Sequence, residues 1–256
     1  MAATSHSACA SALPVVPAPT TFLAADVGGT HVRVGRVSHG ADAPIELSQY
    51  RTYRCADHAS LDAILADFLR DSRAVDAVVI ASAGVALDDG RFISNNLPWT
   101  IAPRQLRDTL GVRAVHLVND FEAVAYAAPQ MEQRAVVQLS GPTPRHAQPG
   151  GPILVVGPGS GLGAAVWING PRQPTVLATE AGQVALASND PDTAQVLRIL
   201  ARDASYLPIE HVLSGPGLRN LYLALCELHA ATPIHPLPAD ITHAALHSDD
   251  ALARRC

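Results

Sequence analysis

The chain has 256 residues, of which 48% are hydrophobic, and its formal net charge is −5. This length can bury one large core or two modest ones, and the usual domain size favours two. The chain contains arginine but no lysine, and the arginines form no stripe along the sequence. This excludes the electrostatic footprint of a nucleic-acid-binding protein.

The first 20 residues contain no Asp, Glu, Lys or Arg and are rich in Ala, Ser and Pro. They lack the basic start of a signal peptide, so we expect a disordered extension over residues 1–20. No later segment approaches the ~18 apolar residues of a membrane span, so we expect no membrane partner. The four cysteines are scattered without a Cys-x-x-Cys pair, which favours a reducing cytoplasm over a zinc site or a disulfide framework.

A small N-terminal α/β domain is predicted over residues 21–130. Three β-type runs joined by turns open it and favour an antiparallel meander. Apolar residues at helical spacing after Ser60, which is available as a cap, predict a helix, and the later strands alternate with helices as in a βαβ unit. We therefore expect a mixed sheet flanked by helices. The predicted strands are 22–27, 32–37, 47–53, 77–83 and 114–118, and the predicted helices are 60–69 and 103–110.

A second, larger α/β domain is predicted over residues 131–256, because the pattern of elements starts again after Pro129. Asp190 and Pro191 supply a cap and a first-turn proline for its first helix. The predicted strands are 135–139, 153–156, 164–168 and 175–177, and the predicted helices begin near residue 190, cover 217–228, and run from near residue 240 to Cys256.

The apolar strand predicted at 114–118 ends on Asn119 and Asp120. A carboxylate at a strand end can act as a base, and two glycine-rich turns, residues 26–30 and 157–163, flank it in sequence and offer backbone amides to phosphate oxygens. Together these features suggest phosphoryl transfer to a hydroxyl. An alternative role for Asp120 is a helix cap that accepts hydrogen bonds from nearby backbone amides, such as that of Glu122.

Each glycine-rich turn has two interpretations. The turn at 26–30 lies between two predicted strands, so its amides could approach phosphate while Asp26 holds a magnesium ion through water, or it could be an ordinary hairpin turn. The turn at 157–163 contains a Rossmann-like subset, but the residues after it are β-type, which weakens the dinucleotide interpretation and favours a hairpin that contacts phosphates. A lysine-containing P-loop is excluded because the chain has no lysine.

These segments, in this order, resemble the bacterial ATP-dependent glucokinase family of the hexokinase, actin and Hsp70 ATPase superfamily. The resemblance runs from about Phe22 to the end of the chain. It implies a two-domain actin-like (ribonuclease H-like) ATPase fold with mixed sheets flanked by helices. The matching residues are 26–30, Asn96 three places before Trp99, 117–121, 157–163, the loop around Glu180, and 209–218.

The resemblance implies a cytoplasmic ATP:hexose 6-phosphotransferase at the entry to glycolysis, with ATP and Mg²⁺ as cofactors and glucose or a related hexose as substrate. Homodimers are common in such families. Asp120 would be the general base that accepts the proton of the sugar 6-hydroxyl as it attacks the γ-phosphoryl group. The sugar would be held by Asn96 or its neighbour Asn95, Asn119, Asp120, Glu180, Gln183 and Glu210. The nucleotide would be bound by Ala25, Asp26, Val27, Gly28, Gly29, Thr30, Gly157, Gly159, Ser160 and Gly161, with the metal at Asp26.

Two departures from the family pattern matter. The family usually ends the loop around Glu180, here called the glutamate loop, with Gly-Gly-His, where this chain has Ala181, Gly182 and Gln183. An amide therefore replaces an imidazole at a sugar-contacting position, which leaves the preferred sugar open. The family also normally continues with an adenosine-binding strand-turn and a terminal helix. We therefore expect a truncated second domain with uncovered apolar surface and weak ATP affinity.

The sequence thus predicts a glucokinase and leaves two alternatives open. One is a catalytically weak sugar-binding sensor or regulator, which Gln183 favours. The other is an inactive truncated remnant.

Overall fold

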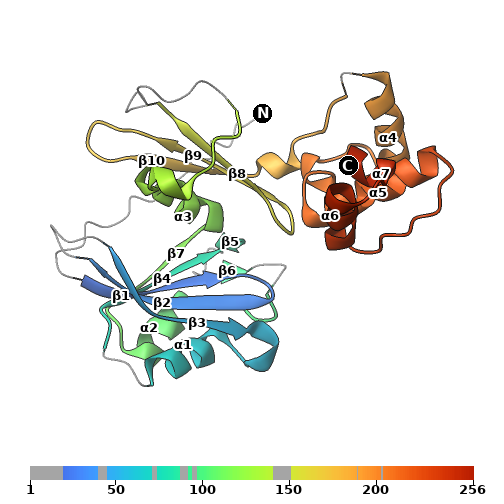
Figure 1. Cartoon of the computed structure of the whole chain (residues 1–256). Coiled ribbons are helices and arrows are strands. Elements are labelled where there is room, and N and C mark those ends of the chain that lie inside the picture. The colour runs from blue at the N-terminus through green and yellow to red at the C-terminus, as the bar shows by residue number, and fades with distance from the viewer. Residues whose placement is uncertain are drawn as a thin grey trace, which may run out of the picture. The chain divides into compact units, whose positions relative to one another are not determined.

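The computed structural model describes residues 20–39, 45–70, 74–86, 92–93, 97–140, 151–188, 190–202 and 204–256. The chain forms two compact units, Met1–Thr143 and Pro144–Cys256, which we describe separately (Figure 1). The predicted disordered extension lies outside the described residues apart from Thr20, and so do Asn95 and Asn96. The domain boundary near residue 130 remains a prediction.

The first unit contains a five-stranded sheet with the strand order β3-β2-β1-β4-β7. Strand β1 pairs antiparallel with β2, which pairs antiparallel with β3, while β1 is parallel to β4 and β4 is parallel to β7. The predicted meander, βαβ arrangement and mixed sheet are therefore confirmed. The strands are β1 (Thr20–Val27), β2 (His31–His39), β3 (Glu46–Arg54), β4 (Ala77–Ser82) and β7 (Ala114–Val118), and a small hairpin pairs β5 (Val85–Ala86) with β6 (Phe92–Ile93).

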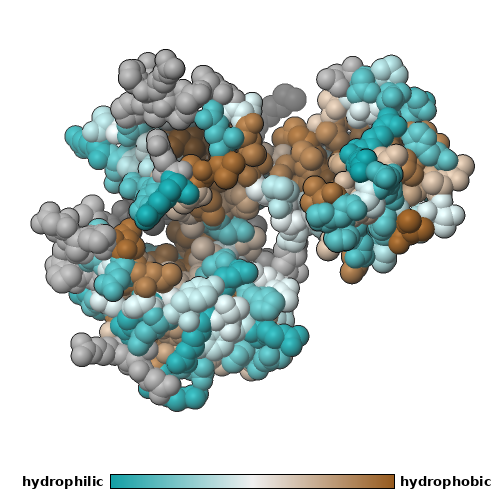
Figure 2. Space-filling view, in the orientation of Figure 1, coloured by the Kyte–Doolittle hydropathy of each residue, from teal (hydrophilic) through white to brown (hydrophobic). Residues whose placement is uncertain are grey.

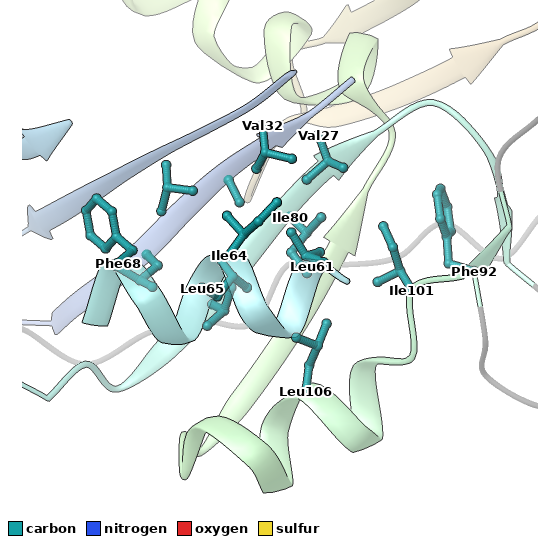
Figure 3. Packing of buried hydrophobic residues seen from close by; sticks show 14 of the residues in the cluster. Val27, Val32, Leu61, Ile64, Leu65, Phe68, Ile80, Phe92, Ile101 and Leu106 are labelled. Carbon is teal, nitrogen blue, oxygen red and sulfur yellow. The ribbon is translucent and has the colours of Figure 1, made fainter. Parts of the chain in front are cut away.

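The helices of this unit are placed by local signals that the sequence carries. Ser60 caps α1 by accepting a hydrogen bond from the amide of Ala63, as predicted. Figure 3 shows the apolar face of α1 turned toward the sheet, where Ile64 lies near Val32 and Ile80. The helical segments are α1 (Leu61–Leu69), α2 (Pro103–Leu110), α3 (Asp120–Ala127) and the 3₁₀ turns η1 (Cys55–Asp57), η2 (Ala128–Gln130) and η3 (Gln133–Ala135).

The strand predicted at 135–139 is wrong. Residue 135 ends η3, and residues 136–139 pair with no strand in the part of the chain that the structure describes. Val137 and Leu139 are 83% and 94% exposed. A strand needs a hydrogen-bonding neighbour as well as β-type residues, and this segment has the residue types without the neighbour.

The second unit begins with a three-stranded antiparallel sheet in the order β10-β9-β8. Four α-helices and two 3₁₀ turns follow it among the described residues. The elements are β8 (Ile153–Pro158), β9 (Leu162–Ile168), β10 (Thr175–Thr179), η4 (Ala181–Gln183), α4 (Pro191–Ala201), η5 (Ile209–His211), α5 (Gly215–Leu228), α6 (Pro238–His247) and α7 (Ala251–Arg255). Asp190 caps α4 through the amides of Asp192 and Thr193, as its sequence position predicted.

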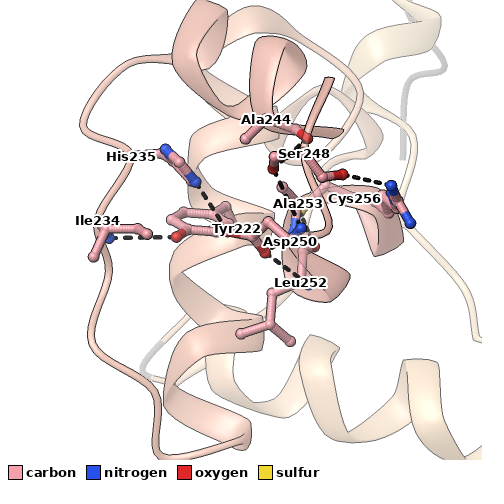
Figure 4. A network of polar contacts seen from close by, with 10 residues as sticks. Tyr222, Ile234, His235, Ala244, Ser248, Asp250, Leu252, Ala253 and Cys256 are labelled. Atoms are coloured by element: carbon pink, nitrogen blue, oxygen red, sulfur yellow. Dashed lines mark hydrogen bonds and ion pairs between the residues drawn. The ribbon is translucent and has the colours of Figure 1, made fainter. Parts of the chain in front are cut away.

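A single helix from residue 240 to Cys256 is wrong, because the segment forms α6 and α7 with a break between them. The Ser248 hydroxyl donates to the carbonyl of Ala244 and competes with the helix ladder. Asp250 then starts a new helix by accepting hydrogen bonds from the amides of Leu252 and Ala253 (Figure 4). Ser248 therefore ends α6, and Asp250 caps the start of α7.

Apolar side chains are exposed on the sheet of the second unit. On β8, Leu154 and Val156 are 64% and 51% exposed, while Ile153 and Val155 alternate with them and are half-buried. Figure 2 shows hydrophobic surface, in brown, over this sheet. Among the described residues, no helix is long and apolar enough to cross a membrane.

Candidate active site

The first glycine turn and Asp120 lie at the same edge of the first unit's sheet. The turn follows the carboxyl end of β1, and Asp120 follows the carboxyl end of β7, with the parallel strand β4 between them. The two positions are therefore separated by two strand spacings, about 10 Å. The buried Ser82 hydroxyl donates to the carbonyl of Val27 and joins β4 to β1 at this edge. Ligands of open α/β sheets bind outside the carboxyl ends of parallel strands.

The first turn is a tight hairpin that accepts two hydrogen bonds from Cys55. The amide of Gly28 donates to the carbonyl of His31 over 3.0 Å. The amide of Cys55 donates to the carbonyl of Thr30 over 2.9 Å, and its thiol donates to the carbonyl of Gly28 over 3.2 Å. Burial raises the pKa of this thiol above its ordinary value, so it remains protonated and able to donate.

The predicted nucleotide contacts of this segment differ in exposure. Gly28, Gly29 and Thr30 are exposed, and the amides of Gly29 and Thr30 can approach a ligand, whereas the amide of Gly28 already donates to the carbonyl of His31. The side chains of Ala25 and Val27 are buried in the core, so only their backbone atoms are available to a nucleotide.

Asp26, the predicted metal residue, pairs with Arg33 on the neighbouring strand. Their side chains are about half exposed, and Nη1 of Arg33 lies 2.8 Å from Oδ2 of Asp26. No cluster of three potential metal ligands exists among the described residues. Magnesium commonly keeps several waters and is bound by one or two carboxylates together with substrate phosphates. A single exposed carboxylate beside a glycine turn fits that pattern.

The helix that follows β7 is capped by Asn119 and not by Asp120. Oδ1 of Asn119 accepts hydrogen bonds from the amides of Phe121 at 2.9 Å and Glu122 at 3.2 Å. Oδ1 of Asp120 accepts only from the amide of Phe121, and Oδ2 has no hydrogen-bond partner within the described ranges. The alternative in which Asp120 is the cap is therefore wrong, and its half-buried carboxylate has capacity for a ligand.

The second glycine-rich turn is a hairpin between β8 and β9. Gly157 pairs with Gly163 across the two strands, and the amide of Gly159 donates to the carbonyl of Gly161 around Ser160. A strand and not a helix follows the turn, so the dinucleotide interpretation does not hold. The amide of Gly215, the first residue of α5, donates to the carbonyl of Gly159 over 2.8 Å and fastens the hairpin to that helix.

Glu210 joins this hairpin to the glutamate loop. Nε2 of Gln183 donates to Oε1 of Glu210 over 2.5 Å, and the amide of Leu162 donates to Oε2 over 3.3 Å. The structure thus brings Gln183 and Glu210 together, although 27 residues separate them in sequence. Glu180 precedes η4 and has an exposed side chain, so it is accessible to a ligand.

Sequence reasoning missed three of these supporting groups. Arg33 could have been found, because the hairpin register places it opposite Asp26. The anchoring contacts of Cys55 and of the Leu162 amide depend on chain segments far apart in sequence, and no local pattern signals them.

Comparisons with known proteins identify the family of the chain. A family model described as glucokinase matches residues 23–256. A glucokinase-like protein from Xylella fastidiosa (strain Temecula1) is 48% identical over 248 residues, an alignment that covers 93% of this chain and 73% of that protein. A glucokinase from Yersinia enterocolitica is 34% identical over 234 residues, covering 91% of this chain and 70% of that protein.

Solved structures give the same fold. A glucokinase from an Antarctic psychrotroph superposes with a TM-score of 0.78 at 27% identity, covering 92% of this chain and 73% of that one. A glucokinase from Balamuthia mandrillaris in complex with glucose has a TM-score of 0.72 at 19% identity, covering 93% of this chain and 72% of that one. The predicted actin-like fold with mixed sheets and flanking helices is confirmed.

Proposed function

The chain belongs to the glucokinase family, and from that premise we propose that it transfers the γ-phosphoryl group of ATP to the 6-hydroxyl of glucose. The observation that carries the proposal is the division of roles between Asn119 and Asp120. Because Asn119 caps α3, the carboxylate of Asp120 retains a free oxygen at the sheet edge that also carries the first glycine turn. A base and a phosphate-type turn at one edge suit phosphoryl transfer to a hydroxyl.

In this proposal Asp120 accepts the proton of the 6-hydroxyl as that oxygen attacks the γ-phosphorus, and the bond from phosphorus to the β,γ-bridging oxygen of ATP breaks. Glu180, Gln183 and Glu210 hold other hydroxyls of the sugar and fix its orientation. Positioning of this kind supplies most of the catalysis in phosphoryl transfer.

The phosphate chain of ATP would be bound by the exposed amides of Gly29 and Thr30, beside Gly28, and by the hairpin around Ser160. Mg²⁺, bound to the nucleotide and held through water by Asp26, would neutralise charge that develops on the transferred group. Arg33 keeps Asp26 in place by its ion pair.

Replacement of Asp120 by Asn tests the base. Asparagine keeps the size of the side chain but cannot accept the proton, so turnover measured as ADP formation is expected to fall by about 10²–10⁴-fold. Glucose binding, measured by calorimetry, should change far less. Asp108→Asn, on the exposed surface of α2, is the matched control and should retain turnover.

Full turnover by Asp120→Asn would refute the proposed base. Glucose binding by the unmodified chain without any phosphate transfer would instead favour a sugar sensor. A panel of glucose, mannose and related hexoses would define the preferred sugar, since these differ at single hydroxyls.

A further inference from the structure

The carboxylate of Glu210 bridges two segments that are expected to bind different substrates. Its Oε1 accepts from the side chain of Gln183 in the glutamate loop, and its Oε2 accepts from the backbone amide of Leu162 in the glycine-rich hairpin. The first segment belongs to the proposed sugar contacts and the second to the proposed phosphate contacts. One side chain therefore touches both.

Two glycines leave the space that this bridge occupies. A Cβ atom at Gly161 would lie 2.7 Å from Oε2 of Glu210, and a Cβ atom at Gly182 would lie 3.2 Å from the same oxygen. The Gly182 position would also meet the carbonyl of Leu162 at 2.5 Å. The hairpin, the loop and the carboxylate are thus packed so closely that neither glycine tolerates a side chain without a shift.

Glu210 is itself held firmly on its backbone side. Its carbonyl accepts from the hydroxyl of Ser214 over 2.7 Å, and that buried hydroxyl accepts from the amide of Gly217 to cap α5. The same helix start fastens the hairpin through Gly215 and Gly159. The backbone of Glu210 and one end of the hairpin therefore share a rigid base, and the Oε2 contact to Leu162 is the adjustable connection between them.

We infer that Glu210 couples hexose occupancy to the position of the glycine-rich hairpin, and this inference rests on the proposed function. A sugar hydroxyl that donates to the carboxylate would fix its rotamer and with it the acceptor of the Leu162 amide. That contact, at 3.3 Å, is at the long end of hydrogen-bond distances and has room to shorten. Hexose that orders the hairpin would increase nucleotide affinity by some factor. By linkage, a nucleotide whose phosphates order the hairpin would increase hexose affinity by that same factor.

Hydrogen–deuterium exchange of peptides that cover residues 157–163 tests the coupling. In the unmodified chain, saturating glucose should slow exchange in this hairpin several-fold. In Glu210→Gln the response should disappear, because an amide offers one acceptor oxygen and cannot serve both segments. Glu227→Gln, an exposed glutamate of α5 that pairs with Arg202, is the matched control and should keep the response.

A second variant breaks the contact while Glu210 keeps its carboxylate. Gly161→Ala should push Oε2 away from the hairpin, so glucose should still bind by calorimetry while the hairpin no longer responds.

If the unmodified chain binds glucose but its hairpin exchange does not change, the inference is overturned and the proposed function still stands. No glucose binding at all would overturn both. Retention of the full response in either folded variant, judged by cooperative thermal unfolding, would also overturn the inference.

Discussion

The side-chain amide of Asn119 caps the helix whose first residue is Asp120. Oδ1 of Asn119 accepts from the backbone amides of Phe121 and Glu122, which would otherwise be unsatisfied at the helix start. Asp120 follows at the positive end of the helix dipole, which favours a negative charge there. Asn119 thus satisfies the backbone amides at the helix start, and the carboxylate of Asp120 stays available to a ligand.

Substitutions of Asn119 should separate its structural and ligand roles. Asn119→Ala should lower the free energy of unfolding by about 1 kcal/mol, whereas Asn119→Ser, a good cap, should change it by only a few tenths. Both should raise the KM for glucose roughly fivefold if Nδ2 binds a sugar hydroxyl, since a hydrogen bond of about 1 kcal/mol is lost. Urea unfolding and steady-state kinetics measure the two effects. Ser60→Ala, which removes the cap of α1, is the control with lost stability and unchanged KM.

Gln183→His should make glucose binding depend on pH. The amide of Gln183 does not titrate, so the dissociation constant for glucose is expected to be nearly flat between pH 6 and 8. An imidazole at this position titrates near a pKa of about 6.5, and below that pH both ring nitrogens are donors, so the ring can no longer accept from a hydroxyl. Glucose affinity of the variant should therefore fall as the pH is lowered. Calorimetric titrations of both proteins at several pH values would detect this, and parallel profiles would contradict it.

Local signals explain the parts of the fold that the sequence predicts correctly. Ser60 and Asp190 stand before apolar residues at helical spacing, and both are caps in the structure. The hairpin at 157–163 follows from glycines between two β-type runs. These features depend on residues close in sequence, where side-chain type and spacing decide the outcome.

Long-range pairing explains the errors and the omissions. The segment 136–139 has β-type residues, but whether it forms a strand depends on a neighbour elsewhere in the chain. The partners of Glu210 likewise come from two distant segments, so the sequence predicted the residue and not its contacts. The break between α6 and α7 is different, because its signal, the side chains of Ser248 and Asp250, is local in sequence.

Ala230→Gly should stabilise the chain. Ala230 follows α5 with a φ of 51°, a left-handed conformation that glycine adopts without steric cost. The amides of Ala230 and Ala231 donate to the carbonyls of Glu227 and Cys226, which is the hydrogen-bond pattern of a Schellman motif. We expect a gain of about 1 kcal/mol in the free energy of unfolding. Ala231→Gly, at the next position, should give no gain, and equal effects of the two substitutions in urea would contradict the argument.

Asp250→Asn should remove a pH-dependent contribution to stability. The pKa of Asp250 is lowered first by the backbone amide of Ala253 and then by the side chain of His235, whose Nε2 lies 2.9 Å from Oδ2 (Figure 4). A carboxyl group with a pKa lowered in the folded state contributes stability above its unfolded value of about 3.9, and this stability is lost as the pH falls through the folded value.

Because asparagine is also a good cap, Asp250→Asn isolates the charge from the cap. Above about pH 5 the variant should be less stable by about 0.3 to 1 kcal/mol, the usual size of a charge effect at a helix start, and the difference should close as the pH approaches 3. Thermal unfolding from pH 3 to 7 measures both curves. Asp249→Asn provides the control, since Asp249 is fully exposed and its surface ion pair with Arg254 is worth little, so its curve should stay close to that of the unmodified chain. A constant offset between Asp250→Asn and the unmodified chain at every pH would show that the contribution of Asp250 is not electrostatic.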